Sequence, residues 1–190
     1  MNVDYRNHKQ DLAFENMVAL PETIPFSFSY GEKIYKGFSC DALTFIGKTE
    51  KAQDGRKDVT LFYRLPDGVK VSVLLTHYYT HGATEWTVWF ENDTDHESLV
   101  IGNAQAEIAF QGKNARATGI LGDQTNLYRP YDLPVDEKGV HFVSDSGRAT
   151  HVYFPYFDLK FDHGGALLAI GWAGTWKSDF ELTQDGCVFR

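Results

Sequence analysis

The sequence has 190 residues and a formal net charge of −8 at pH 7; 43% of its residues are hydrophobic and 15% are aromatic. This length suits one domain with a core of its own, and the apolar content excludes an intrinsically disordered chain. An acidic surface repels phosphate backbones and anionic lipid headgroups, so we expect neither nucleic acid nor a membrane as a partner. No apolar run approaches the roughly eighteen residues of a membrane-spanning helix.

Cysteine usage and the N-terminal segment indicate the compartment. Cys40 and Cys187 are the two cysteines, and neither belongs to a CxxC motif. We expect two free thiols in a reducing compartment, with one disulfide as the alternative. The first residues carry charges where a secretory signal needs an apolar core, which predicts a cytoplasmic protein.

In chain order, the first twenty residues are mixed, and Leu12, Phe14 and Met17 indicate either a strand or a short turn of helix. Strand patterns then recur with turn residues between them. The polar segment 49–58 is predicted to be an exposed hairpin loop with Asp54-Gly55 at its tip. The predicted strands are 26–30, 38–46, 59–65, 69–75, 84–90, 99–101, 106–110, 140–143, 152–161, 166–172, 180–182 and 188–189.

Residues 84–90 alternate clearly. Trp86, Val88 and Phe90 share one parity, which we assign to the core, and Trp89 shares the opposite parity with its polar neighbours. Because no segment has a helical period over three turns, and strand signals return every eight to twelve residues or so, we predict an all-β fold of two packed antiparallel sheets. We expect one β-sandwich domain over residues 1–190.

The segment 144–176 contains a predicted hairpin that turns at Asp162–Gly165. Its second arm, 166–172, is apolar throughout, which predicts a strand covered on both faces. Two tryptophans follow, Trp172 and Trp176, with glycines before and between them. They either fill the core or present flat rings at an edge, where such rings suit the C–H faces of sugars.

No motif in the sequence forms a recognisable catalytic centre. His77 and His81 have the spacing of a helical metal pair, but on a strand they lie roughly 13 Å apart, and nothing nearby completes a site. Glu85 with Glu91, and Asp158 with Asp162, are spaced like ordinary surface carboxylates. We therefore predict no catalytic residue, no metal ligand and no cofactor in this chain.

Several segments in order along the chain resemble one enzyme family. They are Ile24-Pro-Phe-Ser-Phe-Ser-Tyr-Gly31, Glu85-Trp-Thr-Val-Trp-Phe-Glu-Asn92, Ser146-Gly-Arg148 with Phe154-Pro-Tyr-Phe157, and Ala169-Ile-Gly-Trp-Ala-Gly-Thr-Trp176. Together they resemble the N-terminal β-supersandwich domain, a galactose-mutarotase-like fold, of bacterial α-galactosidases of glycoside hydrolase family 36. The last segment is the most specific of the four.

The resemblance implies a sandwich that precedes a catalytic (β/α)8 barrel, which carries both catalytic aspartates of a retaining hydrolase. The sequence stops right after apolar Val188-Phe189, and the barrel would begin beyond it. The parent enzyme would hydrolyse terminal α-galactosides, and this chain alone would be inactive. The resemblance also implies that the domain contacts the barrel, supports homo-oligomer contacts and lends Trp172 and Trp176 to the rim of the sugar site.

The alternative is a free-standing carbohydrate-binding or protein-interaction β-sandwich. The two hypotheses differ in the surface they predict. A domain that meets a barrel has an apolar patch, which is exposed when the domain stands alone.

Overall fold

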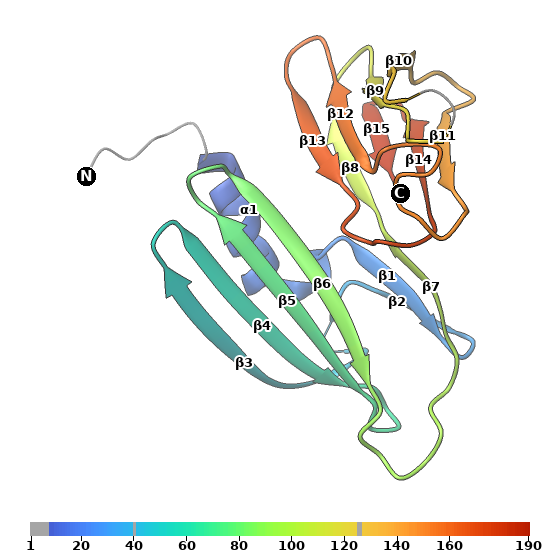
Figure 1. Ribbon diagram of the computed structural model, residues 1–190. Helices are drawn as coiled ribbons and strands as arrows, with labels where there is room; N and C mark the ends of the chain where they lie inside the picture. The colour runs from blue at the N-terminus through green and yellow to red at the C-terminus, as the bar shows by residue number, and fades with distance from the viewer. Residues whose placement is uncertain (1–7, 40, 125–126) are drawn as a thin grey trace. The chain divides into compact units, whose positions relative to one another are not determined.

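The computed structural model describes residues 8–39, 41–124 and 127–190 (Figure 1). Strands account for 53% of the chain and helix for 8%. The strand pairs in the described sheets are antiparallel. The predicted all-β sandwich class is therefore confirmed.

The chain divides into two compact units, Met1–Gln105 and Ala106–Arg190. Each unit has its own cluster of buried residues. Among the described residues, each unit also has two main antiparallel sheets, which provide the opposed layers of a sandwich.

Unit 1 contains a four-stranded sheet and a three-stranded sheet. The first has the order β3 (Thr44–Gln53), β4 (Arg56–Arg64), β5 (Lys70–Tyr78), β6 (Ala83–Glu91). The second has the order β2 (Lys33–Lys36), β1 (Phe26–Tyr30), β7 (Ile101–Ala106). The helix α1 (His8–Ala19) and the 3-10 turn η2 (Pro21–Thr23) precede them.

The four-stranded sheet follows the predicted alternation. Val71, Val73 and Leu75 of β5 are fully buried. On β6, Trp86 packs against the core and Trp89 on the opposite parity is 63% exposed. A period of two thus assigned the two faces of this sheet correctly.

Helix α1 settles the choice that the sequence left open for the first twenty residues. Phe14 is fully buried and stacks on His77 with ring centroids 4.9 Å apart, while Leu12 is half exposed. The helix rests on the core through Phe14, with Met17 and Val18 partly buried beside it. So narrow an apolar stripe gives little helical period.

The predicted loop over 49–58 is wrong. β3 extends to Gln53, β4 begins at Arg56, and only Asp54-Gly55 turns the chain. Gly55 has φ +70°, which suits glycine. The polar residues stand in an edge strand and its neighbour, where side chains reach water while the backbone still pairs. Polarity there marks an exposed strand and not a loop.

Unit 2 contains two four-stranded sheets. One has the order β10 (Pro130–Pro134), β9 (Arg116–Ile120), β12 (Tyr156–Lys160), β13 (Gly165–Ala169). The other has the order β11 (Val140–Ser144), β14 (Trp176–Leu182), β15 (Gly186–Phe189), β8 (Ile108–Gln111). Between them lies an aromatic core in which Phe142, Phe157 and Phe180 are buried and in mutual ring contact.

The predicted burial of 166–172 on both faces is also wrong. β13 ends at Ala169 and is the last strand of its sheet. Leu167 is 85% exposed, and Leu168 on the other parity is only partly buried. A continuous apolar run can therefore come from an edge strand whose outer face is apolar as well as from a buried strand.

Candidate functional site

An apolar surface occupies one end of the outer face of the β10–β9–β12–β13 sheet in unit 2, and the Arg116–Asp132 and Asp158–Lys160 ion pairs lie at the other end. We call the apolar surface the unit 2 apolar face and define it by Ile120, Pro130, Phe154, Tyr156 and Leu167. Tyr156 is 59% exposed and Leu167 is 85% exposed. An apolar surface of this kind on a sheet face is typical of an interaction site.

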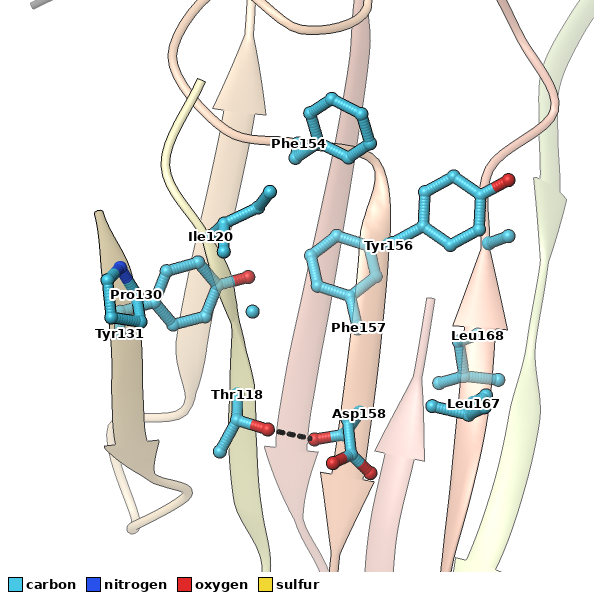
Figure 2. Close-up of a pocket in the computed structure, with 12 residues that line it drawn as sticks. Thr118, Ile120, Pro130, Tyr131, Phe154, Tyr156, Phe157, Asp158, Leu167 and Leu168 are labelled. Atoms are coloured by element: carbon cyan, nitrogen blue, oxygen red, sulfur yellow. Dashed lines mark hydrogen bonds between the residues drawn. The ribbon is translucent and has the colours of Figure 1, made fainter. Parts of the chain in front are cut away.

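A pocket of about 570 Å³ opens within this face. Figure 2 shows its walls, with Phe154 at one end, Tyr156 and Leu167 along one side and Pro130 on the other. The rings of Phe154 and Tyr156 lie 5.8 Å apart, and Tyr128 contacts Phe154 edge-on at 6.3 Å. The walls are thus largely aromatic and aliphatic.

The pocket forms where the regular pairing of β9 with β12 is interrupted, before the chain pairs again at Leu121 opposite Tyr153. The two strands pair regularly up to Thr118 opposite Asp158. Beyond that point the Phe154 N–H donates to the carbonyl of Ile120 at 3.1 Å, and Pro155 has no N–H to give. Gly119 lies in the gap, where a Cβ would sit 2.4 Å from the Tyr131 hydroxyl oxygen. The missing side chain therefore makes room for the Tyr131 hydroxyl.

Polar groups in the pocket are few. The Tyr131 hydroxyl is buried and has no hydrogen-bond partner among the described residues, and burial raises the pKa of that hydroxyl. The Thr118 hydroxyl donates to the backbone carbonyl of Asp158 at 3.0 Å. The Asp158 carboxylate pairs with Lys160 at 3.3 Å, and it is the only carboxylate in the lining. The pocket therefore lacks the carboxylate pair that glycoside cleavage requires.

The two tryptophans predicted for a sugar-site rim have different surroundings. Trp172 is 66% exposed. Trp176 begins β14, is 6% exposed, packs edge-on against Phe157 at 5.8 Å and donates from its indole N–H to the Ala149 carbonyl at 2.7 Å. Trp176 is therefore a core residue of unit 2, whereas Trp172 presents its ring to solvent. Neither side chain lines the pocket.

The other sequence candidates are placed as ordinary structural groups. His77 is fully buried, with its Nδ1 2.8 Å from the Thr84 hydroxyl and its Nε2 2.8 Å from an Asp11 carboxylate oxygen, while His81 is exposed. Across residues 8–39, 41–124 and 127–190, no group of three or more His, Cys, Asp or Glu side chains is arranged to hold a metal ion.

The carboxylates of the two predicted pairs and the one described thiol have ordinary structural surroundings. Glu85 and Glu91 are exposed partners of Tyr78 and Lys70, and Asp162 accepts hydrogen bonds from Asn114. Cys187 is free and buried, and burial raises the pKa of its thiol to about 11. Cys40 lies outside the described residues.

None of the helices in the described ranges has the length and apolar character needed to cross a bilayer.

No family model matches the sequence, and no curated protein sequence matches it. Solved structures do match. The GH36 α-galactosidase AgaA from Geobacillus stearothermophilus superposes on 87% of this chain with TM-score 0.58 and 12% identity, over 26% of its own chain. The α-galactosidase from Lactobacillus brevis superposes on 87% of this chain with TM-score 0.64 and 12% identity, over 25% of its own chain. The galactosidase domain of the α-galactosidase–sucrose kinase AgaSK superposes on 86% of this chain with TM-score 0.62 and 14% identity, over 25% of its own chain.

The fold is that of a part of GH36 α-galactosidases. The resemblance that four sequence segments indicate is thus confirmed at the level of the fold. The chain spans about a quarter of the length of these enzymes.

Sequence reasoning missed the pocket. Its walls come from four strands and a loop between residues 118 and 169, and its position depends on where the regular pairing of β9 with β12 is interrupted. Two signals were available, Pro155 inside the predicted strand 152–161 and Gly119 in β9, a segment that was not predicted to be a strand. Proline and glycine within strands mark such irregular pairing.

Proposed function

We propose that this chain is the non-catalytic N-terminal domain of an α-galactosidase-like glycoside hydrolase. In this proposal the two units form one domain that precedes a catalytic (β/α)8 barrel, and the full-length cytoplasmic enzyme hydrolyses terminal α-galactosides. The observation that carries the proposal is the match to three α-galactosidases over nearly the whole of this chain and only about a quarter of theirs.

The unit 2 apolar face supports this role. An exposed side chain such as Leu167 loses favourable burial, at about 25 cal/mol for each Å² of apolar surface left in water. Covering the face with a second domain recovers that free energy. We assign the barrel as the occupant of this face because an exposed apolar patch is what a barrel-bearing parent predicts for this domain in isolation.

Trp172 is the tryptophan that we propose for the sugar-site rim, since its ring is exposed. For Trp176 we propose a structural role, because its ring and its N–H are both used inside unit 2. Homo-oligomer contacts through this domain remain part of the proposal, as the family resemblance implies.

The test is an assay of purified protein with p-nitrophenyl α-galactoside. The 190-residue chain should show no turnover, while the complete product of the same gene should extend past Arg190 and hydrolyse the substrate. Turnover by the 190-residue chain that is lost in Asp158→Asn would overturn the proposal. A gene that ends at Arg190 would instead favour the free-standing β-sandwich.

A further inference from the structure

The second solvent-facing surface of interest lies on unit 1, on the outer face of the β3–β4–β5–β6 sheet. The inner face is covered, since Phe14 of α1 stacks on His77 and Phe28 of β1 meets Phe90 edge-on at 4.9 Å. Trp89 stands on the opposite face and is 63% exposed. The indole ring of Trp89 is therefore not part of the core of unit 1.

Trp89 belongs to a row of three residues that lie directly across the sheet. Phe62 on β4 pairs with Ser72 on β5, and Ser72 pairs with Trp89 on β6. Adjacent strands lie about 4.8 Å apart, so the Phe62 and Trp89 positions are roughly 10 Å apart with a small hydroxyl residue between them. The row therefore carries two aromatic side chains at a spacing that a short oligosaccharide can span.

The rows on either side supply hydrogen-bonding groups. Thr60 and Thr87 flank Leu74 in one neighbouring row. In the other row, Lys70 pairs with Glu91 at 3.0 Å, and the Lys70 ammonium lies 5.8 Å from the Phe62 ring centroid. Hydroxyl, ammonium and carboxylate groups thus lie near both rings. A ligand hydroxyl can accept a hydrogen bond from the ammonium, donate one to the carboxylate, or do either with a hydroxyl.

The charges on this face are balanced, and most of them are paired. Lys51 and Glu85, which stand on the same face, have opposite charges. Besides the Lys70–Glu91 pair, Arg64 pairs with Asp93 and Arg56 pairs with Asp58. Balanced charges leave no basic track for a phosphate backbone and no excess charge for an ionic ligand. The complementary ligand is electrically neutral, with apolar faces for the rings and many hydroxyls for the polar groups.

We propose that Trp89 and Phe62, with Ser72, Thr87 and the Lys70–Glu91 pair, form a binding platform for neutral oligosaccharides or polysaccharides. The platform lies on unit 1, whereas Trp172 and the unit 2 apolar face lie on unit 2. The platform therefore does not rest on the proposed function and remains testable whether or not a barrel follows this chain.

The experiment is native electrophoresis of the 190-residue chain through gels that contain guar galactomannan, hydroxyethylcellulose or soluble starch, with heparin as the anionic comparison. We expect at least one neutral polymer, and not heparin, to retard the chain. Trp89→Ala should weaken binding tenfold or more, Phe62→Ala should weaken it less, and Trp89→Phe should retain part of it.

The matched control is Tyr156→Ala, because that aromatic side chain is exposed to a similar degree but lies on unit 2, on the face that we assign to the barrel. It should bind like the unchanged chain. The melting temperature and circular dichroism of each variant show that it is folded. Absence of retardation by all three neutral polymers overturns the platform, and so does retardation that survives in Trp89→Ala. Loss of binding in Tyr156→Ala alone overturns it as well and moves the sugar contact to unit 2.

Discussion

The outer sheet faces of the two units differ in composition. The face on unit 1 sets Trp89 and Phe62 among hydroxyls and paired charges, whereas the face on unit 2 joins Tyr156, Leu167 and Phe154 into an apolar surface with few polar groups. Buried centres of protein interfaces are depleted in charged residues, while sugar sites need hydrogen-bonding groups beside the rings. The polar surroundings of an exposed aromatic side chain therefore indicate, more than the aromatic itself, what covers it.

The interiors differ as well. Unit 1 ties its helix to its sheet through His77, which contacts both Asp11 and Thr84. The core of unit 2 is mainly aromatic, with Phe142, Phe157 and Phe180 in contact. Loss of this polar link should therefore affect unit 1 most, whereas loss of a buried aromatic ring should be costly in either unit.

The largest expected effect separates the two tryptophans of unit 2. Trp176→Ala should lower the free energy of unfolding by about 3–5 kcal/mol, because it removes a buried ring and its hydrogen bond. Trp172→Ala should cost less than about 1 kcal/mol, since its ring is already in water. Denaturant unfolding measures both. If both substitutions cost the full core amount, Trp172 is structural and its assignment to the rim fails.

The next effect tests the polar link in unit 1. His77→Phe keeps a flat ring for Phe14 to stack on but leaves Thr84 and Asp11 without their partner. We expect a loss of about 1–3 kcal/mol, the usual cost of an unsatisfied polar group. Hydrogen exchange should become faster in α1 than in the strands of unit 2. Equal acceleration in both units would show that this histidine does not hold the helix.

Acid should weaken unit 1 before unit 2. Hydrogen bonds from Arg56, Tyr30 and Arg64 lower the pKa values of Asp58, Asp67 and Asp93 respectively, and all three carboxyls are in unit 1. A lowered folded pKa gives stability that is present above the unfolded value, about 3.9 for Asp, and is lost as pH falls through the folded value.

A histidine of unit 2 gives stability with the opposite dependence on pH. Asp179 raises the pKa of His141, so the contribution of His141 to stability is complete below the unfolded value of about 6.5 and is lost as pH rises through the folded value.

Fluorine NMR of fluorotryptophan-labelled protein can follow both units, because Trp86 and Trp89 report on unit 1 and Trp172 and Trp176 on unit 2. Below pH 4 the unit 1 signals should change first; simultaneous loss of all four would contradict this order.

The smallest expected effect concerns the unit 2 apolar face. Leu167→Asp in the 190-residue chain should change the free energy of unfolding by no more than about 0.5 kcal/mol, because the side chain is 85% exposed. Leu182→Asp, on the other sheet of unit 2, is the matched control at 45% exposure. A large loss for Leu167→Asp alone, measured by urea unfolding, would mean that this face is already covered within the chain.

Much of the fold follows from a period of two along the sequence. The pattern placed Trp86 and Trp89 on opposite faces of one strand, as the structure has them. The pattern failed at α1, because Phe14 is the one fully buried apolar residue of this helix and so narrow an apolar stripe gives no helical period in the sequence. It failed again at β13, because an apolar strand at an edge has the same composition as one at the centre of a sheet.

The candidate site was less predictable than the fold. The AIGWAGTW segment marked both tryptophans, but nothing local distinguishes Trp176, whose N–H finds the distant Ala149 carbonyl, from Trp172. The pocket depends on the register of β9 against β12, and register is set by pairing across the sheet. Such information is absent from any single stretch of sequence.

The central claim is that a barrel covers the unit 2 apolar face and leaves the unit 1 platform open. Hydroxyl-radical footprinting of the 190-residue chain, alone and within the complete gene product, tests it most directly. Oxidation of Tyr156 and Leu167 should slow several-fold in the complete protein, while Trp89 should react at the same rate in both. Equal rates at Tyr156 and Leu167 in the two proteins would contradict the account.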